Sequence, residues 1–101
     1  MKLIDQRTAN GSRYFSQLAN AANWSGVRDH TLRLPGVKIA NCVEPGPADP
    51  WLDFFFRGHR FVIHGRQQSL HLFVDDPQCS DLILYQVGRH FEQLAQEADE
   101  R

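Results

Sequence analysis

The chain has 101 residues, 42% of them hydrophobic, and its 11 basic and 12 acidic side chains leave a net charge of -1. This length is typical of one domain with one core, which we expect to span residues 1–101. The balanced charge disfavours nucleic acids and membrane surfaces as partners bound through a broad electrostatic field. No apolar stretch is long enough for a secretory signal or a membrane span, so we expect a cytoplasmic protein.

The two cysteines give no sign of a metal site. Cys42 and Cys79 stand without a CxxC motif or a Cys/His pair at zinc-ligand spacing. We interpret both as free thiols, Cys42 packing in a strand and Cys79 in a loop before a helix. An HExxH motif, a phosphate-binding glycine loop and a dinucleotide fingerprint are also absent. The sequence therefore predicts neither a bound metal nor a cofactor.

The N-terminal part predicts a helix that begins at Ser12. Residues 1–11 show no clear period and are expected to fray, whereas Ser12 is a good N-cap after the breaker at residues 10–11. The residues that then fall on one helical face are Phe15, Leu18, Ala19 and Ala22. Trp24-Ser25-Gly26 is expected to end this helix.

A hairpin is expected next. Thr31 to Leu34 and Val37 to Cys42 read as strands, and Pro35-Gly36 fits the centre of a type II turn between them. The predicted pairs are Leu34 with Val37 and Leu32 with Ile39. Three of the five prolines fall within residues 44–50, which predicts a loop rather than a strand.

Residues 51–57, 60–64 and 69–75 predict a three-stranded meander. A type II′ turn at Gly58-His59 would pair Phe56 with Phe61, and a loop at residues 65–68 would pair Ile63 with Leu70. Strict alternation then puts eight large apolar residues on one face: Leu52, Phe54, Phe56, Phe61, Ile63, Leu70, Leu72 and Val74. This face is the predicted core.

The C-terminal part predicts a second helix with Ser80 as N-cap and Asp81 in its first turn. Its apolar stripe is Leu84, Val87, Phe91, Leu94 and Ala98. Residues 97–101 are polar and expected to fray. The predicted fold is therefore α+β: an N-terminal helix, an antiparallel meander of about five strands and a C-terminal helix, with both helices on one face of the sheet.

The other face of the predicted sheet mixes aromatic and charged side chains. Alternation places there Trp51, Asp53, Phe55, Arg57, Arg60, Val62, His64, Ser69, His71, Phe73 and Asp75, with Arg33 and Lys38 from the first hairpin. A covered face would be nearly all apolar, so we expect this one to be open or partly covered. The candidate binding residues are Trp51, Phe55, Arg57, Arg60, His64, His71 and Phe73.

Three residues of this face could carry acid/base chemistry or hold a metal. In the predicted register Asp53 lies opposite His64, and His71 is diagonal to His64. A carboxylate could orient one imidazole for proton transfer, or the three side chains could contribute metal ligands. A simple cross-strand hydrogen bond between Asp53 and His64 explains the same pattern without a site.

The sequence favours a non-catalytic interaction module, such as an adaptor, an inhibitor or an immunity-like protein, that binds another protein or a second copy of itself. One alternative is a metal or acid/base enzyme site at Asp53, His64 and His71. A second alternative is single-stranded nucleic-acid binding by sheet aromatics and arginines, which the balanced charge and the missing RNA-recognition motifs disfavour.

Overall fold

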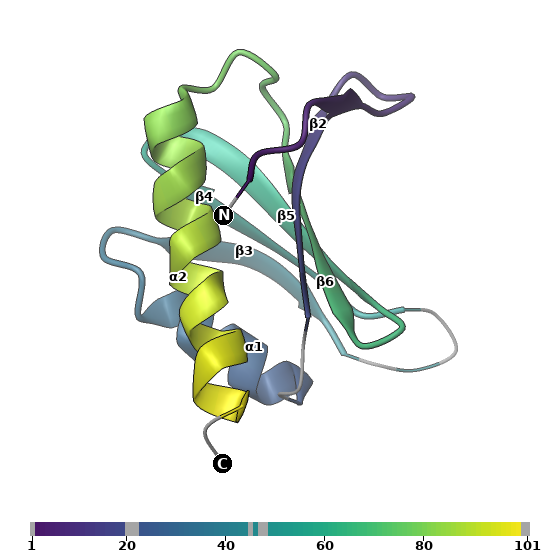
Figure 1. The fold of residues 1–101 in the computed structure, drawn as a ribbon, viewed down its shortest axis with the longest axis vertical. Helices are drawn as coiled ribbons and strands as arrows, with labels where there is room; N and C mark the ends of the chain where they lie inside the picture. Colours follow the sequence, from purple (N-terminus) through teal and green to yellow (C-terminus); the bar gives the residue numbers. More distant parts are fainter. Residues whose placement is uncertain (1, 20–22, 45, 47–48, 100–101) are drawn as a thin grey trace.

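The computed structural model describes residues 2–19, 23–44, 46 and 49–99. Their elements are β1 (Gln6–Arg7), β2 (Arg13–Ala19), α1 (Trp24–Leu32), β3 (Lys38–Val43), β4 (Trp51–Phe56), β5 (His59–Arg66), β6 (Ser69–Val74) and α2 (Asp81–Asp99). The strands form one antiparallel sheet in the order β1-β2-β6-β5-β4-β3, and both helices lie on one side of it (Figure 1). The predicted α+β class and the placement of both helices on one face are confirmed, with six strands rather than about five.

The helix predicted from Ser12 is wrong, because residues 13–19 form β2. Its register with β6 shifts between Tyr14 and Ser16, so that both Phe15 and Ser16 are buried. Such a bulge interrupts the two-residue alternation of buried and exposed side chains that is typical of a strand. The apolar residues are then spaced as they would be on one face of a helix. The strand β1 pairs with β2 inside the segment expected to fray, and Ala22 lies outside the described residues.

The first helix, α1, lies further along the chain than predicted. It covers residues 24–26, where the predicted helix was expected to end, and the start of the predicted strand at residues 31–34. Asn23 caps α1, because its side-chain oxygen accepts a hydrogen bond from the Gly26 backbone N–H at 2.8 Å. Thr31 is fully buried in α1 and donates to the backbone oxygen of Val27 at 2.8 Å. The predicted strand at residues 31–34 and its pairs with Val37 and Ile39 are therefore wrong. The partner strand β3 is confirmed.

The meander of β4, β5 and β6 is confirmed, with both turns shifted by one residue. Arg57 and Gly58, both at positive φ, form the first turn in place of Gly58-His59, and Gln67 and Gln68 form the second. As a result Phe54 pairs with Phe61 and Ile63 pairs with Leu72. Each register differs from the prediction by two residues, which leaves every side chain on its predicted face.

All eight residues predicted for the core face are buried. They pack with α2, from which the predicted stripe residues Leu84, Val87, Phe91 and Leu94 are also buried. The helix begins at Asp81, and the Ser80 hydroxyl accepts a hydrogen bond from the Leu82 N–H at 3.2 Å. This core places the helices on one side and leaves the other side of the sheet uncovered by them (Figure 1).

The two helices are joined by a reciprocal pair of histidines. His30 Nε2 donates to the backbone oxygen of His90 and His90 Nε2 donates to that of His30, both at 2.6 Å. The two rings stack with their centroids 4.1 Å apart. This contact fixes α1 against the middle of α2.

Three further expectations concern local features. Cys42 and Cys79 are free thiols, and burial is the main cause that raises the pKa of Cys79. No helix in the described ranges is both long and apolar enough to cross a membrane. Residues 45, 47 and 48 of the predicted proline-rich loop lie outside the described residues.

Candidate binding site on the open sheet face

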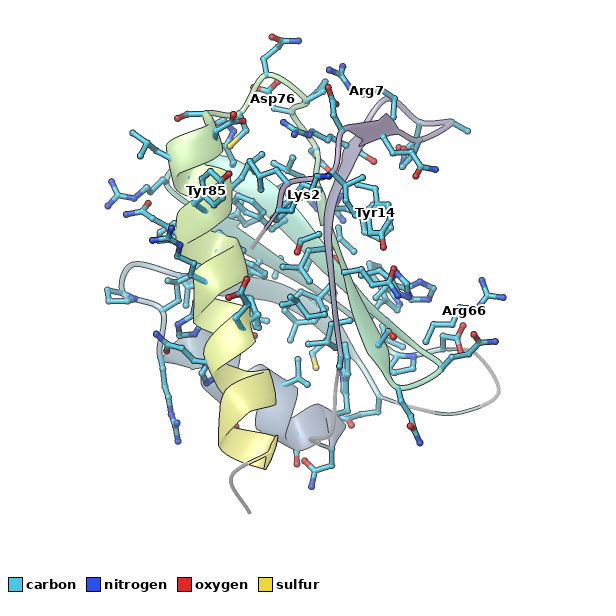
Figure 2. The ribbon with its side chains drawn as sticks, in the orientation of Figure 1. Lys2, Arg7, Tyr14, Arg66, Asp76 and Tyr85 are labelled. Carbon is cyan, nitrogen blue, oxygen red and sulfur yellow. The ribbon has the colours of Figure 1, made fainter. Side chains whose placement is uncertain are left out.

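We call the side of the sheet that faces away from the helices the open face. The registers place on it Tyr14 and Gln17 of β2, Lys38, Asn41 and Val43 of β3, Trp51, Asp53 and Phe55 of β4, Arg60, Val62 and His64 of β5, and Ser69, His71 and Phe73 of β6. Tyr14 points away from α2 in Figure 2. Six of the seven predicted binding residues therefore lie on this face.

Two residues placed on this face by the sequence lie elsewhere. Arg57 belongs to the turn between β4 and β5, where it lines a groove beside α2. Arg33 is the C-cap of α1 rather than a strand residue. The error for Arg57 comes from extending β4 past its last paired residue, and that for Arg33 comes from assigning the end of α1 to a strand.

A charged cluster lies toward the end of the open face that is nearest the turn between β4 and β5. Arg60 donates from Nη2 to Asp53, and from Nη1 to the two oxygens of Asp75 at 3.2 and 3.3 Å. Asp53 is only 2% exposed, and its Oδ1 has no hydrogen-bond partner among the described residues. The hydrogen bond to Asp53, followed by that to Asp75, raises the pKa of Arg60. Arg60 is thereby held as a fixed cation.

Asp53 does not pair with a histidine, contrary to the prediction. Its cross-strand partner is Val62, whereas His64 lies opposite Trp51 on one side and His71 on the other. The shift of two residues in the register replaces His64 by Arg60 as the partner of the carboxylate. The structure therefore brings the two histidines together and leaves Asp53 outside the pair.

Next to the histidine pair lies an aromatic cluster of Tyr14, His71 and Phe73, of which the sequence did not predict Tyr14. The Tyr14 hydroxyl and His71 Nδ1 form a hydrogen bond of 2.9 Å, and the Tyr14 ring lies 5.1 Å from that of Phe73. On the other side, His64 Nε2 is 3.7 Å from an Asp49 oxygen. Tyr14 was missed because its segment was assigned to a helix; its position beside Phe15 in an aromatic-rich run was the available strand signal.

The environment of His71 predicts a pH effect. The pKa of His71 is lowered from its ordinary value of 6.5. Burial is the largest cause, followed by the charges of His64 and Arg66. Between the lowered pKa and 6.5 the unfolded chain binds more protons at this histidine than the folded chain does. The contribution of His71 to folding stability is therefore fully present above pH 6.5 and is lost as the pH falls through that window. Burial also raises the pKa of Tyr14.

We expect NMR titration of the imidazole signals to show His71 titrating below 6.5. Arg66→Gln should raise the pKa of His71, because it removes a nearby positive charge, and Arg28→Gln on α1 should leave it unchanged. A His71 that titrates above 6.5 in the native protein would contradict this account of its surroundings.

A hollow with both polar and apolar lining residues adjoins the charged cluster. It has a volume of about 340 Å³ and lies between Thr8, Asn10 and Ser12 at the N-terminal hairpin and Arg60, Val62, Phe73 and Asp75. The sequence did not predict that the N-terminal hairpin lines this hollow, because it predicted neither β1 nor β2. The hollow makes this end of the open face concave.

The face also exposes apolar side chains along β3 and β4: Phe55 lies opposite Arg60 and Lys38, and Val43 and Trp51 lie at the far end of the two strands. Phe55 is 44% exposed, Val43 is exposed, and Trp51, the cross-strand partner of Val43, is half-buried. No group of three or more His, Cys, Asp or Glu side chains in the described residues could hold a metal.

The chain matches no family model, no curated protein and no solved structure. Its function is therefore inferred from its own residues.

Proposed function

We propose that the chain is a non-catalytic protein-interaction module, an adaptor, inhibitor or immunity-like protein of the cytoplasm, which binds another protein through the open face. The observation that carries this proposal is the 44% exposed Phe55, with half-buried Trp51 four residues earlier on the same side of β4, on a sheet face that neither helix covers. Aromatic residues and arginine dominate the energetic centres of protein interfaces. Free thiols at Cys42 and Cys79 are compatible with a reducing compartment.

The charged cluster supports specificity at such an interface. Arg60 is held between Asp53 and Asp75, so its position is set before a partner arrives. A fixed arginine next to exposed Phe55 can donate to a partner without losing much side-chain entropy on binding. The hollow at Val62 and Phe73 offers a concave site for one partner side chain.

Acid/base catalysis receives less support. The Asp53 carboxylate, which the sequence predicted to orient His64, is bonded to Arg60 instead, and His64 lies opposite His71. Catalytic groups act best in enclosed sites with little water, whereas His64 and His71 are only partly buried on an open sheet.

Site-specific photo-crosslinking tests the proposal. A benzophenone amino acid replaces Phe55 in one variant and Leu82 in a matched control, since Leu82 is 77% exposed and lies on α2, on the opposite side of the sheet. We expect one defined protein adduct in the producing cell from position 55 and none from position 82. A second copy of this chain in the adduct would identify a homodimer. Equal adducts from both positions, or none from position 55, would contradict the proposal.

A further inference from the structure

A basic groove lies on the helix side of the molecule, away from the open face. It has a volume of about 300 Å³ and is bounded by α2, by the loop after α1 and by the turn between β4 and β5. Arg57 of the turn and Arg89 of α2 both line it, as do Gln86 and Gln93. The two arginines come from elements that the core holds at fixed positions.

The described residues place no negative charge in the lining of this groove. Within the described part of the chain, no acidic side chain lines the groove, and neither Arg57 nor Arg89 has a carboxylate within 4.0 Å. Arg7, Arg13, Arg28 and Arg60 each have such a partner, whereas Arg33 and Arg66, which lie outside the groove, have none among the described residues. The positive charge of the groove is therefore available to a ligand.

The two guanidinium groups also lie against aromatic rings. The guanidinium carbon of Arg57 is 5.5 Å from the ring centroid of Phe56, and that of Arg89 is 5.5 Å from the ring centroid of Tyr85 on α2. Contact with a ring face restricts an arginine and leaves its N–H edge available to an anion. Buried Leu34 and Phe56 add apolar surface to the groove.

We propose that this groove binds a small organic anion, a carboxylate or phosphate group carried on an apolar body. The planar N–H edge of a guanidinium matches the oxygens of both groups. The volume lies at the lower end of the range of about 300–1,000 Å³ for small-molecule sites, which suits a ligand of about one ring. Arg57 and Arg89 bind the anionic group, and Leu34 and Phe56 contact the apolar body.

Titration of the isotope-labelled protein with phenyl phosphate, benzoate and inorganic phosphate, followed by amide NMR, tests this site. We expect phenyl phosphate or benzoate to shift the amides of Arg57 and of residues 86–93 below about 10 mM ligand, and the tighter of the two identifies the anionic group. Inorganic phosphate should bind at least about tenfold more weakly, since it lacks the apolar body.

The matched variants are Arg57→Gln/Arg89→Gln and, as control, Arg66→Gln, which removes an exposed arginine on the hairpin between β5 and β6. We expect the double variant to lose at least about tenfold in affinity and the control to keep it, with both amide spectra folded. Unchanged affinity in the double variant, no shifts at these amides, or equally tight inorganic phosphate would overturn the proposal. Crosslinking from position 55 is expected to be unaffected by the double variant, so the two proposals fail separately.

Discussion

Phe91→Ala is expected to lower the free energy of unfolding by about 3–5 kcal/mol, the cost of removing a large aromatic side chain from a packed core. Phe91 is fully buried in α2, and its ring centroid lies 6.1 Å from that of Phe54 in the sheet and 5.8 Å from that of His30 in α1. One ring thus contacts both helices and the sheet. Its loss leaves a cavity where the three elements meet.

Urea unfolding followed by circular dichroism measures this effect. Leu82→Ala is the matched control on the same helix, because Leu82 is largely exposed, and we expect it to change stability by less than about 0.5 kcal/mol. A loss below about 1 kcal/mol for Phe91→Ala would show that α2 does not pack on the sheet as described.

Arg60→Met is expected to produce the second large loss, since it leaves the carboxylate of Asp53 buried without its cation. About a third of the Arg60 side chain is exposed, so water can partly replace it. We therefore expect a loss of about 2–4 kcal/mol, compared with about 3–5 kcal/mol for removing one partner of a fully buried pair. Methionine keeps most of the apolar stem of arginine, so the change tests the charge.

Two further variants isolate this charge. Asp75→Asn removes the exposed partner of Arg60 and should cost less than about 1 kcal/mol. Adding Asp53→Asn to Arg60→Met should restore about 1 kcal/mol or more, because a neutral amide costs less to bury than an unpaired carboxylate. If Arg60→Met costs no more than Asp75→Asn, Asp53 is not the buried partner described here.

The faces of the meander could be predicted because they depend only on alternation. The first turn was assigned one residue too late and the second one residue too early, and each pairing therefore slipped by two residues. An even slip keeps each side chain on its face, so the core residues and the open-face aromatics Trp51 and Phe55 were assigned to the correct faces. The same slip changes every cross-strand neighbour, which is why the partner of Asp53 could not be predicted.

The segment before the meander could not be assigned from periodicity. In β2 the bulge after Tyr14 buries Phe15 and Ser16 in succession and imitates helical spacing. In α1 the β-branched Thr31 resembles a strand residue, but its hydroxyl bonds back to the preceding turn of the helix. The Asn23 cap was a readable signal for α1. Tyr14 and the hollow beside it were missed for the same reason.

The central claim is that the open face binds a protein, and the affinity of the crosslinked partner, measured by calorimetry, tests it most directly. We expect Trp51→Ser and Phe55→Ser each to weaken binding by about 2 kcal/mol, or about thirtyfold, as for central interface aromatics. Leu82→Ser, on the other side of the molecule, should bind as the native chain does. Unchanged affinity in both open-face variants, with their folds intact, would contradict the claim.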